Sequence, residues 1–179
     1  MIKRLILMVT AAALLLGMAP AALAQEQVFS GIHAGLTLPE GVYQTVLTPA
    51  NLEANAAFIQ SQGGTAEAWQ ADFAARGILL QAYDTQNDRV LVVAALQDVD
   101  AQQLFDINAH TSAERAKYRT AHGASGAYSV LGYRYDSVSW KNFPKVGRFL
   151  QLRYTYREGG EIVRRGYQRR TIRNGHTIT

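Results

Sequence analysis

Three long strand patterns fill the last third of the chain, and they constrain the fold more than any other feature. The patterns cover residues 128–140, 146–157 and 162–173, with Gly159-Gly160 between the last two. Asn174-Gly175 then predicts a type I′ turn, which needs a positive φ at both positions. Strands joined by tight turns pair in the antiparallel direction. The sequence therefore predicts an antiparallel sheet as the framework of the fold.

Residues 29–96 add a hairpin, two helices and two strands. We expect the hairpin over residues 29–48, with its turn at Pro39-Glu40-Gly41, and a first helix over residues 49–60. The second helix begins after Thr65 and ends at Gly77, which are a typical N-cap and a typical terminator.

Two strand patterns follow, at residues 78–83 and 90–96. The second is apolar on both faces, so we expect both of its faces to be covered. Thr111 and Glu114 then form a capping-box pattern for a helix that continues to about His122.

The first 24 residues have the three-part pattern of a secretory signal peptide. Lys3 and Arg4 give a positive start, an apolar run extends from Leu5 to Met18, and Ala22-Leu23-Ala24 forms a small-x-small cleavage site. A membrane anchor is the alternative, but the run is shorter than the roughly 20 apolar residues that a spanning helix needs. We therefore expect cleavage after Ala24, no transmembrane segment afterwards, and an extracytoplasmic location, either secreted or in the cell envelope.

Charge is distributed unevenly along the rest of the chain. Residues 25–140 carry 6 basic and 12 acidic side chains, a net charge of −6, whereas residues 141–179 carry 10 and 2, a net charge of +8. Two interpretations stay open. Either the two segments neutralise each other within the fold, since surface ion pairs are common, or the basic segment presents a positive surface to an anionic partner.

Residues suited to metal or cofactor binding are sparse. The chain has no cysteine, so neither thiol chemistry nor a disulfide is available. Its histidines lie far apart without the spacing of a metal site; they are His33, His110, His122 and His176. The sequence contains neither a phosphate-binding loop nor a dinucleotide-binding fingerprint. We therefore expect no metal and no cofactor.

Catalytic patterns are equally weak. The segment from His122 to Gly126 departs from the Gly-x-Ser-x-Gly nucleophile motif and follows an expected helix rather than a strand. Asp98 with Asp100, and Asp84 with Asp88, occupy positions where turns and helix caps already favour aspartate. We expect no catalytic residue among them and favour a protein that is not an enzyme.

Arginines and tyrosines gather on the two strands around Gly159-Gly160. In a hairpin symmetric about these glycines, Leu150 faces Arg169, Leu152 faces Tyr167 and Tyr154 faces Arg165, about 5 Å apart, a distance that allows arginine–tyrosine stacking. Arginine doublets at 164–165 and 169–170 place cations on both faces of a regular strand. This requires one solvated face, a bulge near Gly166, or a strand that overhangs the core.

The candidate contacts for an anion or other partner are therefore Tyr154, Arg165, Tyr167, Arg169 and Arg173. A solvent-exposed meander without any partner has the same sequence pattern, so this alternative stays open.

Two segments resemble a known family. They are Leu38-Pro39-Glu40-Gly41-Val42-Tyr43 and the stretch QRRTIRNGHTIT from Gln168 to Thr179. With the order of elements, they resemble a poorly characterised family of exported bacterial proteins with the PsbP-like α/β/α sandwich, over about residues 28–179. The resemblance implies an extracytoplasmic accessory or binding role and supplies no catalytic residues. Members of the family close with a helix on the sheet, so we expect that the sequence is truncated and that a further strand and helix follow residue 179.

These observations predict a single α+β domain over residues 25–179, with an antiparallel sheet of about six to eight strands and helices packed on it. We expect an exported, non-enzymatic accessory or binding protein. Its expected partner is an anionic envelope polymer, a lipid head group or another exported protein. The alternative is a secreted hydrolase whose site assembles only in space. Nucleic acid is not expected as a partner, because the signal peptide directs the protein out of the cytoplasm.

Overall fold

The computed structural model describes residues 25–179 except Ala124 and residues 127–131. The predicted signal peptide and the first residues of the strand expected at 128–140 lie outside this part of the chain. The described residues form two compact units: residues 25–46 with 82–89, and the described residues of 47–81 with 90–179. The expectation of one domain over residues 25–179 stays a prediction.

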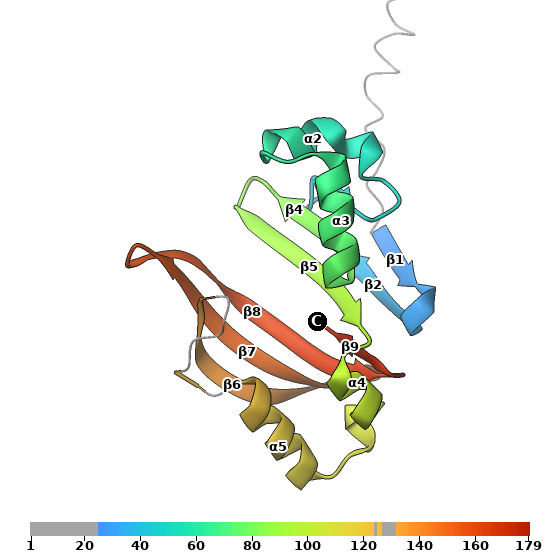
Figure 1. The fold of residues 1–179 in the computed structure, drawn as a ribbon, viewed down its shortest axis with the longest axis vertical. Helices are drawn as coiled ribbons and strands as arrows, with labels where there is room; N and C mark the ends of the chain where they lie inside the picture. Colours follow the sequence, from blue (N-terminus) through green and yellow to red (C-terminus); the bar gives the residue numbers. More distant parts are fainter. Residues whose placement is uncertain (1–24, 124, 127–131) are drawn as a thin grey trace, which may run out of the picture. The chain divides into compact units, whose positions relative to one another are not determined.

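The strands of the described residues form two sheets (Figure 1). β1 (Gln25–Phe29) and β2 (Ala34–Leu38) pair as a small antiparallel sheet. A seven-stranded antiparallel sheet has the order β3-β4-β5-β9-β8-β7-β6. Its strands are β3 (Thr45–Leu47), β4 (Ile78–Asp84), β5 (Arg89–Leu96), β6 (Tyr133–Phe143), β7 (Gly147–Glu158), β8 (Glu161–Arg173) and β9 (His176–Ile178).

Four α-helices of the described part of the chain pack against this sheet: α2 (Ala56–Ser61), α3 (Ala66–Arg76), α4 (Val99–Leu104) and α5 (Ser112–His122). Short 3₁₀ segments lie at η1 (Ser30–Ile32), η2 (Glu53–Asn55) and η3 (Ile107–Ala109). The predicted fold class is therefore confirmed: the chain is α+β, with an antiparallel sheet of the expected size and helices packed on it.

Local sequence signals place several of these elements correctly. Thr65 Oγ1 accepts a hydrogen bond from the Ala68 N–H at 3.2 Å and so caps α3, which ends at Gly77 with a φ of +60°. The capping box of α5 is present, with Thr111 and Glu114 in the expected roles. Asn174 and Gly175 both have positive φ, as the predicted turn before β9 requires.

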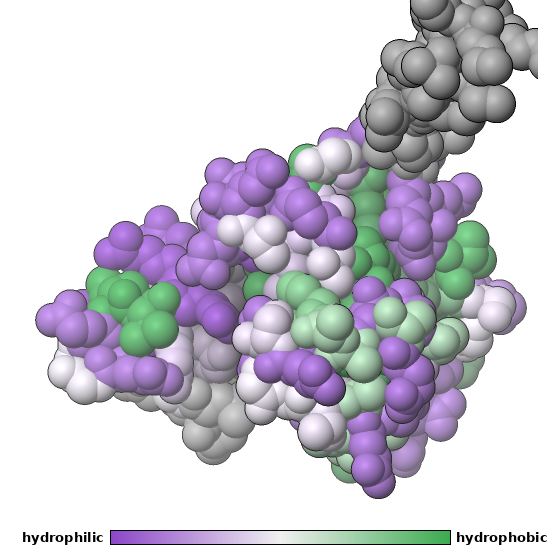
Figure 2. Space-filling view, turned by 90° about the horizontal axis from the view of Figure 1, so that it is seen from above, coloured by the Kyte–Doolittle hydropathy of each residue, from purple (hydrophilic) through white to green (hydrophobic). Residues whose placement is uncertain are grey.

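Two expectations for the first half of the chain are wrong. β2 pairs with β1, whereas the segment expected to return along β2 forms β3 in the other sheet. The strand with buried residues on both faces is β4 and not β5, in which Val90 and Val92 are exposed. An apolar run shows that a strand can be buried, but neighbouring elements decide whether it is. In Figure 2, the exposed apolar residues of the visible face form separate patches among hydrophilic ones.

The core that positions the candidate site lies between the meander β6–β8 and helices α4 and α5, which occupy one side of these strands (Figure 1). Its buried residues are Ala101, Ile107, Tyr118, Leu150, Leu152 and Ile172. The end of α5 approaches the sheet closely at Gly123, where an added Cβ would lie 2.8 Å from Leu152 and 2.9 Å from Val138. A glycine is therefore needed at this contact.

Candidate functional site

Strands β7 and β8 carry all five predicted contact residues, but the register of their hairpin differs by one residue from the symmetric expectation. The observed pairs are Leu150 with Arg170, Leu152 with Gln168, and Tyr154 with Gly166. Because side chains alternate between the faces of a strand, a shift of one residue moves every side chain of β8 to the opposite face.

The shift comes from a β-bulge near the end of the hairpin. Tyr156 pairs with Arg164, whereas Arg157 pairs with Ile162, so Val163 is an extra residue in β8. A bulge was expected near Gly166, three residues further on. Gly166 has a different role, because an added Cβ there would lie 2.7 Å from the Tyr154 hydroxyl. The glycine makes room for the tyrosine ring that lies across it.

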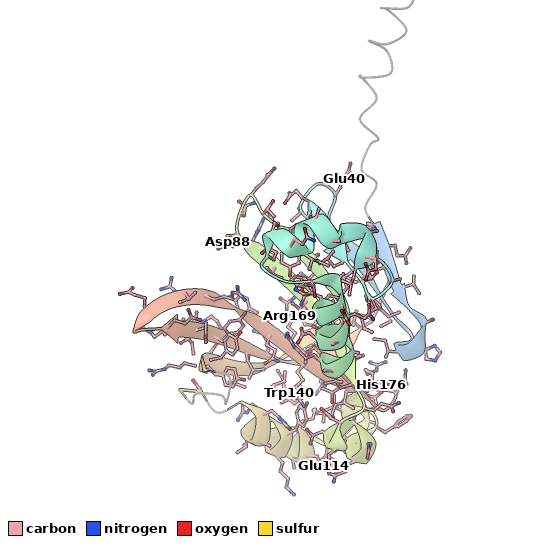
Figure 3. All side chains as sticks on the ribbon, turned by 45° about the horizontal axis from the view of Figure 1, so that its top comes forward. Glu40, Asp88, Glu114, Trp140, Arg169 and His176 are labelled. Atoms are coloured by element: carbon pink, nitrogen blue, oxygen red, sulfur yellow. The ribbon has the colours of Figure 1, made fainter. Side chains whose placement is uncertain are left out.

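The meander has one face covered by α4 and α5 and one open face. Leu150 and Leu152 point towards the helices, so the odd-numbered residues of β7 and β8 lie on the other side. Figure 3 shows Trp140 on the side of α5 and Arg169 on the side away from it. We define the open face by Lys141, Phe143, Phe149, Gln151, Arg153, Arg165, Tyr167 and Arg169.

Three of the five predicted contact residues, Arg165, Tyr167 and Arg169, share the open face. The guanidinium of Arg169 lies 5.1 Å from the centre of the Phe143 ring, and its Nε donates a hydrogen bond to Gln151 Oε1 at 3.1 Å. Tyr167 is 61% exposed. Arg169 is thus held in place by an aromatic ring and a neutral amide, neither of which cancels its charge.

Negative charge is scarce on the open face. Arg153 lies 3.9 Å from Asp136, at the limit of an ion pair. Within the described part of the chain, the side chains of Arg165 and Lys141 have neither a hydrogen bond nor an ion pair. The residues that define the open face therefore include four cations and no acid, and Asp136 beside them contacts Arg153 alone among these cations.

The other two predicted residues lie elsewhere. Tyr154 is half-buried on the covered face, where its ring centre lies 4.9 Å from that of Tyr133, and burial raises the pKa of its hydroxyl. Arg173 lies beside the β8–β9 turn, with its Nε 3.3 Å from Asp106 Oδ2 and its Nη1 donating to the Val146 carbonyl. The five candidates therefore do not form one cluster.

A polar network on the covered face was missed by the sequence analysis. Arg170 Nη2 lies 3.0 Å from Asp98 Oδ2 and 3.4 Å from Asp100 Oδ2, while its Nε donates to the Tyr118 hydroxyl at 2.6 Å. The Arg170 side chain is only 20% exposed. Here the basic segment does neutralise acidic residues from earlier in the chain, which is one of the two interpretations of the charge pattern.

The same network reaches four elements. Asp98 Oδ1 caps α4 by accepting from the Ala101 N–H at 2.9 Å and also accepts from Thr177 Oγ1 in β9 at 2.7 Å. His122, at the end of α5, lies with its Nε2 2.8 Å from Asp100 Oδ2. The network therefore ties α4, α5, β8 and β9 together.

The histidine and aspartate of this network resemble the base and orienting group of a hydrolase, but none of the described residues stands beside His122 as a nucleophile. Burial, and next the positive charge of Arg170, lower the pKa of His122, and burial raises the pKa of Tyr118 to about 12. None of the described hydroxyls hydrogen-bonds to His122, and Ser125 Oγ donates to the Asp136 carbonyl at 3.1 Å. The geometry thus gives no support to the hydrolase alternative.

The remaining candidates for metal or acid–base chemistry have structural contacts. Among the described residues, no three His, Asp or Glu side chains come together in a way that could hold a metal ion. Asp84 closes the β4–β5 turn, where it accepts hydrogen bonds from the Asn87 backbone and side chain and from Arg89. Aspartate at this position is explained by the turn alone.

The sequence did hold a signal for the missed network. Two acidic side chains at 98 and 100 and an arginine doublet at 169–170 are charges of opposite sign. Which arginine meets the acids depends on the register of β8, and the register depends on the bulge at Val163. That bulge has no marker in the sequence.

Comparisons with known proteins found no match: no family model, no curated protein and no solved structure matches the chain. None of the helices in the described residues is long and apolar enough to cross a membrane.

Proposed function

We propose that the chain is an exported, non-catalytic binding protein of the PsbP-like type, which uses the open face of β6–β8 to contact an anionic partner in the cell envelope or outside the cell. The observation that carries the proposal is the contrast between neighbouring arginines. Arg170 is ion-paired to two aspartates, whereas Arg169 and Arg165 have no acid beside them in the described part of the chain.

An extended anionic polymer fits this face better than a compact ligand. Arg165 and Arg169 are four residues apart on one strand, about 13 Å at 3.3 Å per residue, so a ligand with charges spaced along it contacts both guanidinium groups without either side chain bending across Tyr167. Tyr167 lies between them in sequence and is exposed. Its ring could pack on the apolar side of a repeating unit while the arginines contact the charged groups.

The proposal is tested by sedimenting the purified protein with the envelope fraction of its source organism over a series of salt concentrations. We expect binding at low salt that falls steeply as salt increases, because contacts between guanidinium groups and a polyanion release counterions. Soluble dextran sulfate, a generic polyanion, should compete with the envelope fraction for the protein.

Two double variants distinguish binding through the open face from a general effect of the protein's net charge. Arg165→Gln with Arg169→Gln should weaken envelope binding by about tenfold or more, since each charged contact contributes on the order of 1 kcal/mol or more. Arg164→Gln with Lys145→Gln removes the same charge outside the open face and should leave most of the binding intact. Equal loss in both double variants, or binding that does not depend on salt, would contradict the proposal.

A further inference from the structure

A second basic feature lies on the other side of the meander, between α5 and strands β6 and β7. It is an open pocket with a volume of about 260 Å³. The residues that line it are Ser112, Arg115, Ala116, Arg119, Trp140 and Arg148. Three of the six are arginines and none is acidic, so the lining carries a charge of +3.

Nearby acidic groups do not cancel this charge. Glu114 precedes Arg115 but turns back to the start of α5, where its Oε2 accepts from the Thr111 N–H and hydroxyl, both at 2.8 Å. These hydrogen bonds, and next the one from His110, lower the pKa of Glu114 to about 2. The carboxylate is thus already engaged at the helix cap.

The arginines are positioned but not neutralised. Arg115 Nη1 donates to the His110 carbonyl, which anchors its guanidinium at the pocket. The side chains of Arg119 and Arg148 form no hydrogen bond or ion pair with other described residues. Arg115 and Arg119 are four residues apart on α5, where like charges repel each other. An anion bound between them would relieve this repulsion.

Trp140 supplies an independent observation. Its Nε1 is buried and has no hydrogen-bond acceptor in the described part of the chain. An indole N–H normally finds a partner when it is buried, and an unsatisfied one calls for an explanation such as a bound water or ion. The pocket lining thus offers three guanidinium groups and one hydroxyl, and the unsatisfied indole N–H lies buried in a residue of the same lining. Such a lining is rich in hydrogen-bond donors and contains no carboxylate.

We propose that this pocket binds an oxyanion, namely a phosphate group, either as free phosphate or as a phosphate ester. Its oxygens accept hydrogen bonds from Arg119 and Arg148, and Trp140, as a lining residue, lies beside the bound ion. Arginine is suited to this role because its planar fork of N–H groups matches phosphate oxygens. The pocket lies on the covered face, so the proposal is independent of the function proposed for the open face.

The indole N–H of Trp140 gives a direct readout by ¹⁵N–¹H NMR of the full-length protein. The chain has two tryptophans, so Trp69→Phe assigns the two indole signals. Titration with inorganic phosphate should move the Trp140 signal along a saturable curve while the Trp69 signal stays in place. Sodium chloride at matched ionic strength should leave both signals unchanged.

Variants locate the site. Arg119→Gln with Arg148→Gln should weaken phosphate binding by about tenfold or more, because each charge-assisted hydrogen bond contributes about 1.5 kcal/mol or more. Lys117→Gln, on the same helix but outside the pocket lining, removes a positive charge and should bind as the unmodified protein does. The dispersion of the backbone amide signals reports whether each variant is folded.

Two further ligands distinguish the source of the phosphate group. Tighter binding of glycerol 3-phosphate than of inorganic phosphate supports the ester form, and the reverse order supports free phosphate. A Trp140 signal that does not move would overturn the proposal. So would an equal shift with chloride, or equal phosphate affinity in the Arg119/Arg148 double variant.

Discussion

Arg169 and Arg170 are neighbours in the chain, yet they lie in opposite environments. Arg170 is on the covered face of the meander, with two aspartates and a tyrosine hydroxyl around its guanidinium. Arg169 is on the open face, where it contacts a ring and a neutral amide. An arginine thus stabilises the fold on one face and remains available for binding on the other. The two roles differ because successive side chains of a strand point to opposite faces.

The largest expected effect is the difference in stability between the Arg170→Gln and Arg169→Gln variants. Losing Arg170 leaves Asp98 and Asp100 without their cation at a largely buried place, so the free energy of unfolding should fall by about 2–3 kcal/mol. Losing Arg169 should change it by less than about 0.5 kcal/mol, as for a surface residue. Urea denaturation followed by circular dichroism measures both values.

Similar losses in the two arginine variants would show that the covered network contributes no more than the exposed contacts. A double variant sharpens the test. In the Arg170→Gln variant, the unpaired negative charge of Asp100 should lower the free energy of unfolding. Adding Asp100→Asn removes this charge and should partly restore stability, which a double-mutant cycle detects.

Variants of Tyr154 and Tyr167 test the same difference between the covered and open faces for an aromatic side chain. Tyr154→Ala removes a half-buried ring that packs on Tyr133, so we expect a loss of about 2 kcal/mol in the free energy of unfolding. Tyr167→Ala should leave stability within about 0.5 kcal/mol but weaken envelope binding, since this ring is mostly exposed. The same urea titration and the sedimentation assay measure the pair. A Tyr167→Ala variant that binds normally would remove this ring from the binding surface.

The smallest effect is a difference in titration between two histidines. The hydrogen bond from His110 to the Leu104 carbonyl, together with Glu114, raises the pKa of His110 above its ordinary value of 6.5. Burial, and next Arg170, lower the pKa of His122 below 6.5. An NMR titration of the imidazole signals should therefore show His122 losing its proton at a lower pH than His110. The opposite order would contradict this assignment of environments.

The two histidines affect stability with opposite signs. The folded protein binds a proton at His110 more tightly than the unfolded chain does, so this contribution is present below about pH 6.5 and is lost as pH rises through the folded pKa. At His122 the folded protein binds the proton less tightly, so its contribution is present above about pH 6.5 and is lost as pH falls through the folded pKa. Arg170→Gln should raise the pKa of His122 towards 6.5, which links this titration to the first prediction.

Much of the fold could be predicted because its signals are local. The cap at Thr65, the terminator at Gly77, the capping box at Thr111 and the turn at Asn174 each depend on a few adjacent residues, and each is present in the structure. Predictions that required a choice of neighbour were less accurate. The pairing of β2 and the burial of β5 depend on elements distant in the sequence.

The candidate site shows the same division. The sequence alone determined that the last third of the chain is basic, strand-forming and rich in tyrosine, and that each arginine doublet would be divided between two faces. Only the tertiary structure decided which arginine of the 169–170 doublet is covered. The bulge at Val163 shifts the β7–β8 register by one residue, and with a side-chain period of two residues that shift exchanges the faces. It turns Arg170 towards Asp98 and Asp100 and leaves Arg165, Tyr167 and Arg169 on the open side.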